Sequence, residues 1–162
     1  MTAAQLRDAL DYDPETGVFR WREDRNGLAK AGQQAGNTSH VRGYRMIRVN
    51  YNRFLAHRLA WLYVYGEWPS AEIDHADGKT DHNAIANLRL ATHQQNTWNA
   101  IVKSNSVFGV RNIRPKGRKF QVQFSRGGKR IFHKSFPNLP VAIAARDRVA
   151  ATLHGEFASR RG

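Results

Sequence analysis

The chain of 162 residues carries 26 Lys and Arg against 13 Asp and Glu, a formal net charge of +13, and it contains no cysteine. The missing cysteines exclude disulfides and thiolate-bound zinc, and no apolar run approaches the roughly 20 residues that span a bilayer. The opening residues, "MTAAQLRDALDYDPETG", lack a basic patch followed by an apolar stretch, so no secretion signal is expected. The excess of positive charge predicts a polyanionic partner. Nucleic acid is favoured over an anionic membrane because no long basic amphipathic helix is evident.

The charge is distributed unevenly along the chain. Residues 1–70 carry 10 basic and 7 acidic side chains, residues 71–103 carry 3 and 4, and residues 104–162 carry 13 and 2. This pattern predicts two modules, residues 1–103 and the basic residues 104–162. We expect one of them to hold a phosphate backbone and the other to act on it.

The first module opens with short local signals. Thr2 can cap a helix whose residues Leu6 and Leu10 share one face. Pro14 and Gly17 mark a turn, and the strand "VFRW" follows it. We expect these elements to contribute packing and no chemistry.

A loop, a hairpin and a core helix are predicted next. Residues 26–43 are rich in glycine, alanine and polar residues, which is typical of a loop. "YRMIRVNYNRF" predicts a hairpin that turns at residues 50–52. "LAHRLAWLYVYG" is apolar nearly all round and predicts a helix that ends at Gly66 and forms the core of this module.

The most polar stretch of the module is residues 72–96. It holds three histidines, three aspartates and three asparagines. Its pattern predicts a strand, a loop that bends at Asp77 and Gly78, a second strand and a helix. Thr92 can cap that helix, and Gln95 three residues later completes a capping box.

This order of residues suits phosphodiester hydrolysis. That reaction needs a base to take a proton from water, and a hard divalent ion to stabilise the phosphoryl charge and the leaving oxygen. His75 is a candidate base, and Asp74 is a candidate carboxylate ligand. Asn87 can brace the loop or the imidazole, and the amide oxygen of Asn96 can face Asp74.

The segment "DHADGKTDHNAIANLRLATHQQN" resembles the HNH motif of ββα-metal endonucleases, in the zinc-free form of phage and intron homing enzymes. The likeness rests on 12 residues from His75 to Asn87 and 9 from Asn87 to Asn96, and it extends over residues 40–100. It implies an Mg²⁺- or Mn²⁺-dependent nuclease without structural zinc.

The same resemblance assigns roles to individual residues. It implies that His75 is the general base, that Asp74 and Asn96 bind the metal, and that Asn87 positions His75 or its loop. His93 lies three residues before Asn96 on the same helix face and stays open as another ligand.

The basic module predicts a sheet and a helix. In "KFQVQFS" Phe120, Val122 and Phe124 alternate with polar residues, which is typical of a half-buried strand. Two glycines at 127–128 predict a hairpin turn, and "PVAIAARDRVAATLHG" predicts a helix that packs on the sheet.

This tail is similar to the plant ethylene-response (Apetala) type of DNA-binding domain, a three-stranded sheet packed on one helix. "FGVR", "RPKGRKFQVQF" and "AARDRVAATLHG" carry the likeness. In that family the outer face of the sheet lies in the major groove, where arginine can bind guanine and glutamine can bind adenine. The contacts to double-stranded DNA implied here are Arg111, Arg114, Lys116, Arg118, Lys119, Gln121, Gln123, Arg126, Lys129 and Arg130.

The sequence therefore predicts an α+β protein with a ββα-metal HNH nuclease module followed by a small three-stranded-sheet-plus-helix DNA-binding module. We expect a phage-encoded monomer that nicks duplex DNA in the cytoplasm of a bacterial host. Two alternatives stay open. One is a catalytically inactive, sequence-specific DNA-binding regulator with a nuclease-like fold, against which the complete Asp-His-Asn-Asn set argues. The other is an RNA-binding or RNA-cutting protein, against which the lack of an aromatic outer sheet face argues.

Overall fold

The chain forms two compact units, Met1–Asn96 and Thr97–Gly162. The predicted boundary after residue 103 lies outside the described residues. None of the helices in the described part of the chain has both the length and the apolar run that crossing a bilayer requires. The computed structural model describes residues 1–25, 27–38, 43–99, 108 and 110–158.

The first unit begins with a capped helix and a hairpin. Helix α1 (Ala3–Ala9) is capped as predicted, because Thr2 Oγ1 accepts from the backbone N–H of Gln5 at 3.2 Å. The Gln5 side chain accepts in return from the backbone N–H of Thr2 at 2.9 Å. Strands β1 (Leu10–Asp13) and β2 (Val18–Trp21) then pair antiparallel across the predicted turn.

A second hairpin and the core helix follow. Strands β3 (Met46–Val49) and β4 (Asn52–Leu55) pair antiparallel, and helix α2 (Ala56–Tyr65) starts directly after β4. Gly66 ends α2 with a φ of 82°, a left-handed conformation that suits glycine. The predicted hairpin and the predicted helix end are confirmed.

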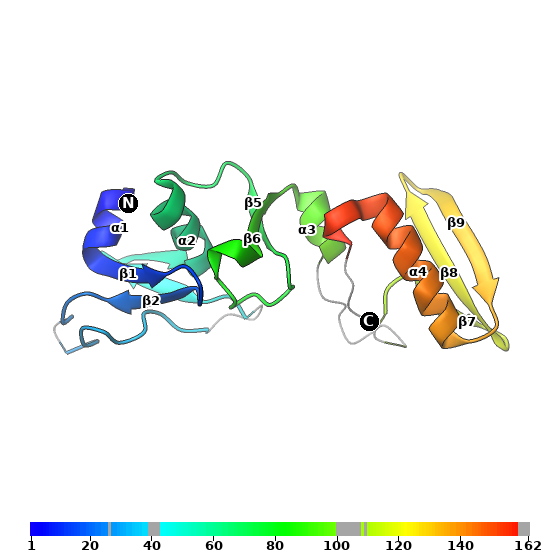
Figure 1. The fold of residues 1–162 in the computed structure, drawn as a ribbon, viewed down its shortest axis with the longest axis horizontal. Helices are drawn as coiled ribbons and strands as arrows, with labels where there is room; N and C mark the ends of the chain where they lie inside the picture. The colour runs from blue at the N-terminus through cyan, green and yellow to red at the C-terminus, as the bar shows by residue number, and fades with distance from the viewer. Residues whose placement is uncertain (26, 39–42, 100–107, 109, 159–162) are drawn as a thin grey trace. The chain divides into compact units, whose positions relative to one another are not determined.

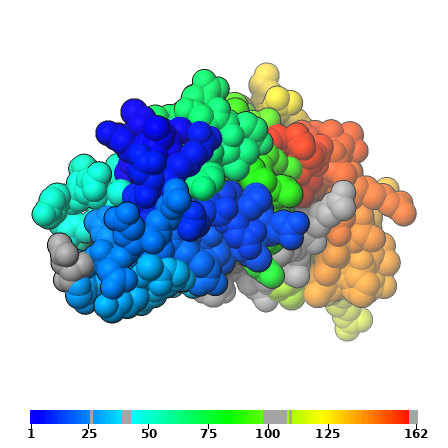
Figure 2. All heavy atoms as spheres, turned by 60° about the vertical axis from the view of Figure 1, so that its left-hand side comes forward, coloured from blue at the N-terminus to red at the C-terminus, as the bar shows by residue number. Residues whose placement is uncertain are grey.

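These elements bury a common core. Helices α1 and α2 pack on each other, and the dark blue N-terminal residues lie against green residues in the space-filling view of Figure 2. Because α2 carries apolar residues on most of its surface, it can contact both hairpins. The largest fully buried side chains of this core are Phe19, Leu6, Leu10, Ile47, Leu59, Leu62 and Val49.

The polar segment folds in the predicted order of strand, loop, strand and helix. Strand β5 (Glu72–His75) pairs antiparallel with β6 (Leu88–Ala91), and helix α3 (His93–Asn99) follows. A single 3-10 turn, η1 (Ile85–Asn87), leads from the loop into β6. This is a ββα arrangement built on a two-stranded sheet.

The second unit is a three-stranded antiparallel sheet with one long helix. Its strands β7 (Ile113–Lys116), β8 (Lys119–Arg126) and β9 (Lys129–Phe136) lie in the order β7-β8-β9. Helix α4 (Leu139–His154) runs along one face of the sheet (Figure 1). A short 3-10 turn, η2 (Gly155–Phe157), follows α4. The core between sheet and helix includes Val122, Phe124, Ala142 and Ala150.

Candidate active site

Strand β5 ends in two adjacent polar residues that the fold buries, Asp74 and His75, each 4% exposed. Arg89 lies opposite Asp74 in the register of β5 and β6. Its Nε donates to Asp74 Oδ2 at 2.8 Å, and its Nη2 lies 2.7 Å from the same oxygen. A buried carboxylate without a cationic partner costs several kcal/mol, so Arg89 makes this position of Asp74 possible.

The contacts of the His75 imidazole include a hydrogen bond and two neighbouring rings. Its Nε2 lies 3.1 Å from Oδ1 of Asn83, a loop residue that is 1% exposed. The ring of His57 meets the His75 ring edge-on at 5.2 Å, and the Tyr44 ring lies 5.9 Å away. These contacts come from three separate segments, which together fix the plane of the imidazole.

Burial sets the protonation state of this histidine pair. It lowers the pKa of His75 below its usual range, while the Asn83 hydrogen bond and the Asp74 and Asp77 carboxylates oppose the shift. Burial also lowers the pKa of His57 to about 3, and the neighbouring His75 adds to the effect. Both rings are therefore neutral near pH 7. A neutral imidazole is the form that can accept a proton.

Asn87 braces the loop between the two strands. Its Oδ1 accepts from the backbone N–H of Asp77 at 3.0 Å, and its Nδ2 donates to Asp77 Oδ1 at 3.0 Å and to the His82 carbonyl at 2.8 Å. Asp77 Oδ2 also lies 2.8 Å from His82 Nδ1. The bend at Gly78 is closed by its N–H, which donates to the His75 carbonyl at 2.8 Å. Asn87 thus contacts the loop, one of its two expected roles, and the loop in turn holds His75.

The N-terminal hairpin supports the same loop from the other side. Tyr12 donates its hydroxyl to the Asn83 carbonyl at 2.7 Å, and the Ile85 N–H donates to the Pro14 carbonyl at 3.1 Å. Gly17 has a φ of 75°, and a Cβ there would overlap the backbone of Asn83 and of the residue after it. The hairpin was expected to contribute packing alone. Its packing also holds Asn83, the residue whose side chain contacts His75, in place.

Asn96 reaches back from α3 to β5. Its Nδ2 donates to Glu72 Oε2 at 2.8 Å and to the Ile73 carbonyl at 3.4 Å. His93 Nδ1 lies 3.0 Å from the other Glu72 oxygen, and its side chain is 88% exposed. The hydrogen bond from Asn96, followed by the one with His93, lowers the pKa of Glu72. With Nδ2 engaged in these contacts, the remaining polar atom of the Asn96 amide is Oδ1.

The donor set fits a lightly coordinated hard cation. Among the described residues no group of three or more His, Asp or Glu side chains is arranged to hold a metal. Mg²⁺ does not require such a group, because it binds proteins through one or two oxygen ligands and completes its shell with water and substrate phosphate. The carboxylate of Asp74 and the amide oxygen of Asn96 are oxygen donors of that kind.

Comparison with known proteins identifies the family that this segment belongs to. The profile of a family described as HNH endonuclease matches residues 54–97. A protein of Acanthamoeba polyphaga mimivirus named as an uncharacterized HNH endonuclease is 32% identical over 152 residues, which cover 93% of this chain and 71% of that protein. This chain belongs to the HNH endonuclease family. Protein 3.8 of Escherichia phage T7 is 30% identical over 122 residues, 71% of this chain and 100% of that protein. No solved structure matches.

In this HNH protein the outer sheet face of the second unit carries a second polar cluster. Arg114 Nε donates to Gln121 Oε1 at 2.9 Å, and its Nη2 donates to Gln123 Oε1 at 2.6 Å. Gln121 is only 2% exposed, and its Oε1 accepts from Arg114. A base edge can therefore reach Gln121 only if neighbouring side chains move, whereas Arg114 is exposed.

Positive side chains surround this cluster. Partial desolvation, then the charges of Arg130, Lys116 and Arg114, lower the pKa of His133, so these cations gather on one face. Arg111 is less available, since its Nη1 donates to the Thr97 carbonyl at 2.7 Å. The predicted contacts that are exposed are Arg114, Lys116, Arg118, Lys119, Arg126, Lys129 and Arg130.

Sequence analysis of the HNH segment missed several residues that contact the site. Asn83 was assigned no role, yet it is buried against His75. Glu72 and Arg89 were assigned no role, although they hold Asn96 and Asp74. Arg89 could have been found, because strand pairing places it opposite Asp74. No local pattern in the sequence marks Asn83.

Proposed function

We propose that this chain is a metal-dependent endonuclease that hydrolyses a phosphodiester bond of DNA with His75 as general base. The observation that carries the proposal is the neutral, buried imidazole of His75, held at the end of β5 beside the Asp74 carboxylate. Membership of the HNH endonuclease family supports it.

The contacts of His75 suggest which nitrogen acts. Asn83 Oδ1 can only accept a hydrogen bond, so His75 Nε2 carries the proton in the contact of 3.1 Å. The lone pair is then on Nδ1, which takes a proton from the attacking water. Asn87 acts indirectly, because it holds the loop that carries Asn83.

Asp74 and Asn96 are the proposed ligands of Mg²⁺ or Mn²⁺. When bound, such an ion supplies stabilisation of the phosphoryl charge and of the departing 3′ oxygen. Arg89 keeps the Asp74 carboxylate in place, and Glu72 orients the Asn96 amide so that Oδ1 faces away from the carboxylate. His93 is bound to Glu72 through Nδ1, which favours Asn96 over His93 as the ligand.

The second unit is proposed to bind the substrate. Its outer sheet face presents Arg114 and the surrounding lysines and arginines to duplex DNA, in the manner of the Apetala-type domain. One chain carries one such site, so we propose that a monomer nicks one strand. The relatives support a viral origin, and the relative from an Escherichia phage favours a phage-encoded enzyme that acts on DNA in the cytoplasm of a bacterial host.

The test is cleavage of supercoiled plasmid with Mg²⁺ or Mn²⁺. The wild-type protein should give open circles, EDTA should stop the reaction, and His75→Ala should reduce the rate by about 10²- to 10⁴-fold, the usual contribution of a general base. Equal rates in wild type and His75→Ala would contradict the assignment. DNA binding without cleavage in either metal would leave the inactive regulator as the function. Tighter binding of single-stranded RNA than of duplex DNA would favour the RNA protein.

Two further variants separate the candidate ligands. Asn96→Ala should raise the metal concentration needed for half-maximal rate. His93→Ala should change it little, because His93 is exposed and turned to Glu72. The opposite order would transfer the ligand role to His93.

A further inference from the structure

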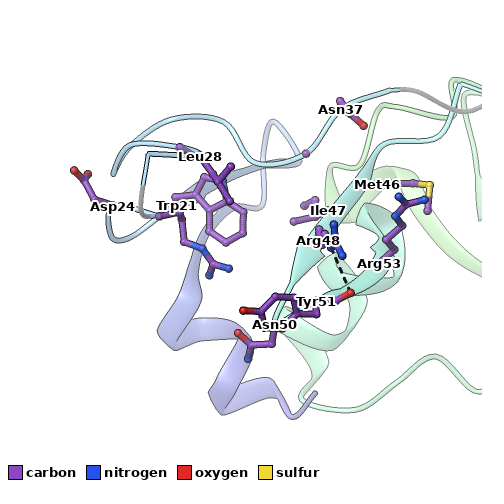
Figure 3. Close-up of a pocket in the computed structure, with 13 residues that line it drawn as sticks. Trp21, Asp24, Leu28, Asn37, Met46, Ile47, Arg48, Asn50, Tyr51 and Arg53 are labelled. Atoms are coloured by element: carbon purple, nitrogen blue, oxygen red, sulfur yellow. Dashed lines mark hydrogen bonds between the residues drawn. The ribbon is translucent and has the colours of Figure 1, made fainter.

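A groove of about 750 Å³ lies in the first unit, outside the candidate active site. Figure 3 shows Trp21 and Leu28 on one side of it and the β3–β4 hairpin with Arg48 and Tyr51 on the other. Its lining includes Trp21, Asp24, Arg25, Arg48, Tyr51 and Arg53.

The tip of the β3–β4 hairpin exposes the aromatic ring of Tyr51 in a strained backbone conformation. Asn50 and Tyr51 form the two-residue turn with φ angles of 47° and 66°. Glycine is preferred at the second position of such a turn, and a bulky residue there is strained. The Tyr51 side chain is 90% exposed, so the ring gains no packing in return. A strained and exposed aromatic residue is better explained by a ligand than by folding.

The positions of the groove arginines also oppose the stability of the hairpin. Arg48 and Arg53 are direct cross-strand partners, and like charges at such positions destabilise a hairpin. The carboxylate among the lining residues, Asp24, is already bound by Lys30 Nζ at 2.7 Å. Arg25 lies 4.5 Å over the Trp21 ring. The positive charge of the groove is therefore available to an anion.

We propose that this groove binds an unpaired segment of a DNA strand. Guanidinium groups that follow phosphates, together with an aromatic ring on which a base can stack, are the features that bind unpaired nucleic acid. Arg48 and Arg53 contact phosphates, and the Tyr51 ring stacks on a base. The groove thus gives the first unit its own hold on the strand, independent of the basic second unit.

The inference rests on the proposed nuclease function only for the identity of the polymer as DNA. Its test needs no cleavage and uses the full chain with His75→Ala. If plasmid cleavage fails, strand binding in the groove can still be measured. If the groove does not bind a single strand, the assignment of the nuclease function still stands.

The first experiment maps the contact by photocrosslinking. A thymidine oligonucleotide of about a dozen nucleotides, within the range of single-stranded site sizes, carries one 5-iododeoxyuridine and is irradiated with the full chain. We expect the crosslink on the peptide that contains Tyr51. Crosslinks confined to peptides of the second unit would overturn the proposal, as would crosslinking that a blunt duplex competes away as well as a single strand does.

Variants then measure the contribution of each group. Tyr51→Gly should weaken binding of the single-stranded oligonucleotide by about tenfold, within the effect of losing one stacked base. It should not lower the melting temperature, because glycine accepts the positive φ. Tyr65→Ala is the matched control, since Tyr65 is exposed and lies outside the groove.

Arg48→Gln with Arg53→Gln should reduce the salt dependence of binding. The slope of log K against log salt should fall by about 0.7 for each phosphate of a single strand that the variant no longer binds. Arg22→Gln removes an arginine of the same unit outside the groove and should leave the slope unchanged. The groove is refuted as the strand-binding site if Tyr51→Gly and Tyr65→Ala bind with equal affinity. It is also refuted if the Arg48 and Arg53 double variant has the same salt slope as Arg22→Gln.

Discussion

The two units of the chain use polar residues in opposite ways. Met1–Asn96 holds 12 basic and 11 acidic side chains, and its candidate residues Asp74, His75 and Asn87 are buried and hydrogen-bonded to neighbouring polar side chains. Thr97–Gly162 holds 14 basic and 2 acidic side chains, and most of its predicted DNA contacts are exposed. The first arrangement fixes a few atoms in place, and the second presents charge.

The difference has an energetic consequence. A buried polar group stabilises a fold only while its partners are present, and removing one partner leaves the other desolvated. An exposed cation binds phosphate without such partners, so its removal changes affinity and little else. Substitutions of the buried site residues of the first unit should therefore damage folding and cleavage together, whereas substitutions of the exposed cations of the second unit should affect binding alone.

The largest stability effect is expected at Gly17. Gly17→Ala adds a Cβ that overlaps the backbone of Asn83, at a φ of 75° that already disfavours alanine. We expect a loss of roughly 3 kcal/mol or more, beyond the usual range for single substitutions, together with reduced cleavage because Asn83 contacts His75. Urea denaturation and plasmid cleavage would measure both.

A glycine of the second unit provides the control. Gly127 has a φ of 56° in the β8–β9 turn, and a Cβ there would meet no atom within 4 Å. Gly127→Ala should cost only the conformational term of about 1–2 kcal/mol. If Gly17→Ala and Gly127→Ala lose the same free energy of unfolding, the N-terminal hairpin does not support the active-site loop as the geometry indicates.

The next largest effect is expected at Asn87. Asn87→Ala removes three hydrogen bonds to Asp77 and His82 and leaves the part-buried N–H of Asp77 without this acceptor. We expect a loss of about 2–3 kcal/mol and a fall in cleavage rate. Gln123→Ala removes an amide of similar size from the outer sheet of the second unit. It should cost less than about 1 kcal/mol, and a larger cost than that of Asn87→Ala would reverse the comparison.

Lowering the pH should destabilise the first unit more than the second, because the folded first unit disfavours protonation of His57. The pKa of His57 in the folded protein is about 3, below its ordinary value. Between these two values the unfolded chain binds a proton that the folded chain does not, so stability falls as the pH falls. The slope is at most about 1.4 kcal/mol per pH unit for one group.

His57→Phe removes this titration and should reduce the slope of unfolding free energy between about pH 6.5 and pH 4.5. His75, whose pKa is also lowered by burial, leaves part of the slope in place. His133, on the exposed sheet of the second unit, also has a lowered pKa, so His133→Phe should reduce the slope too, but by less than His57→Phe because its ring is exposed. An unchanged slope in His57→Phe would show that this ring is not the buried neutral group described above.

The sequence predicted the local elements and the order of the site, because both depend on neighbours in the chain. The capping boxes at Thr2 and Thr92, the bend at Gly78 and the strand–loop–strand–helix order are all confirmed. Contacts between distant segments were not predicted. The ring of His57 beside His75 comes from the packing of α2, and the support of Asn83 by Tyr12 joins residues 71 positions apart. Neither leaves a periodic or spacing signal.

The smallest effect on stability is expected in the β8–β9 turn, where Arg126, Lys129 and Arg130 are exposed. Replacing all three by glutamine should change the free energy of unfolding by no more than about 0.5 kcal/mol for each substitution. Binding of duplex DNA should weaken, and the slope of log K against log salt should fall by about 0.9 for each phosphate that is no longer bound. Fluorescence anisotropy over a range of salt concentrations would measure this. An unchanged salt slope would mean that these cations do not contact phosphate, and the substrate-binding role would then fall to Arg114 and its neighbours on the sheet face.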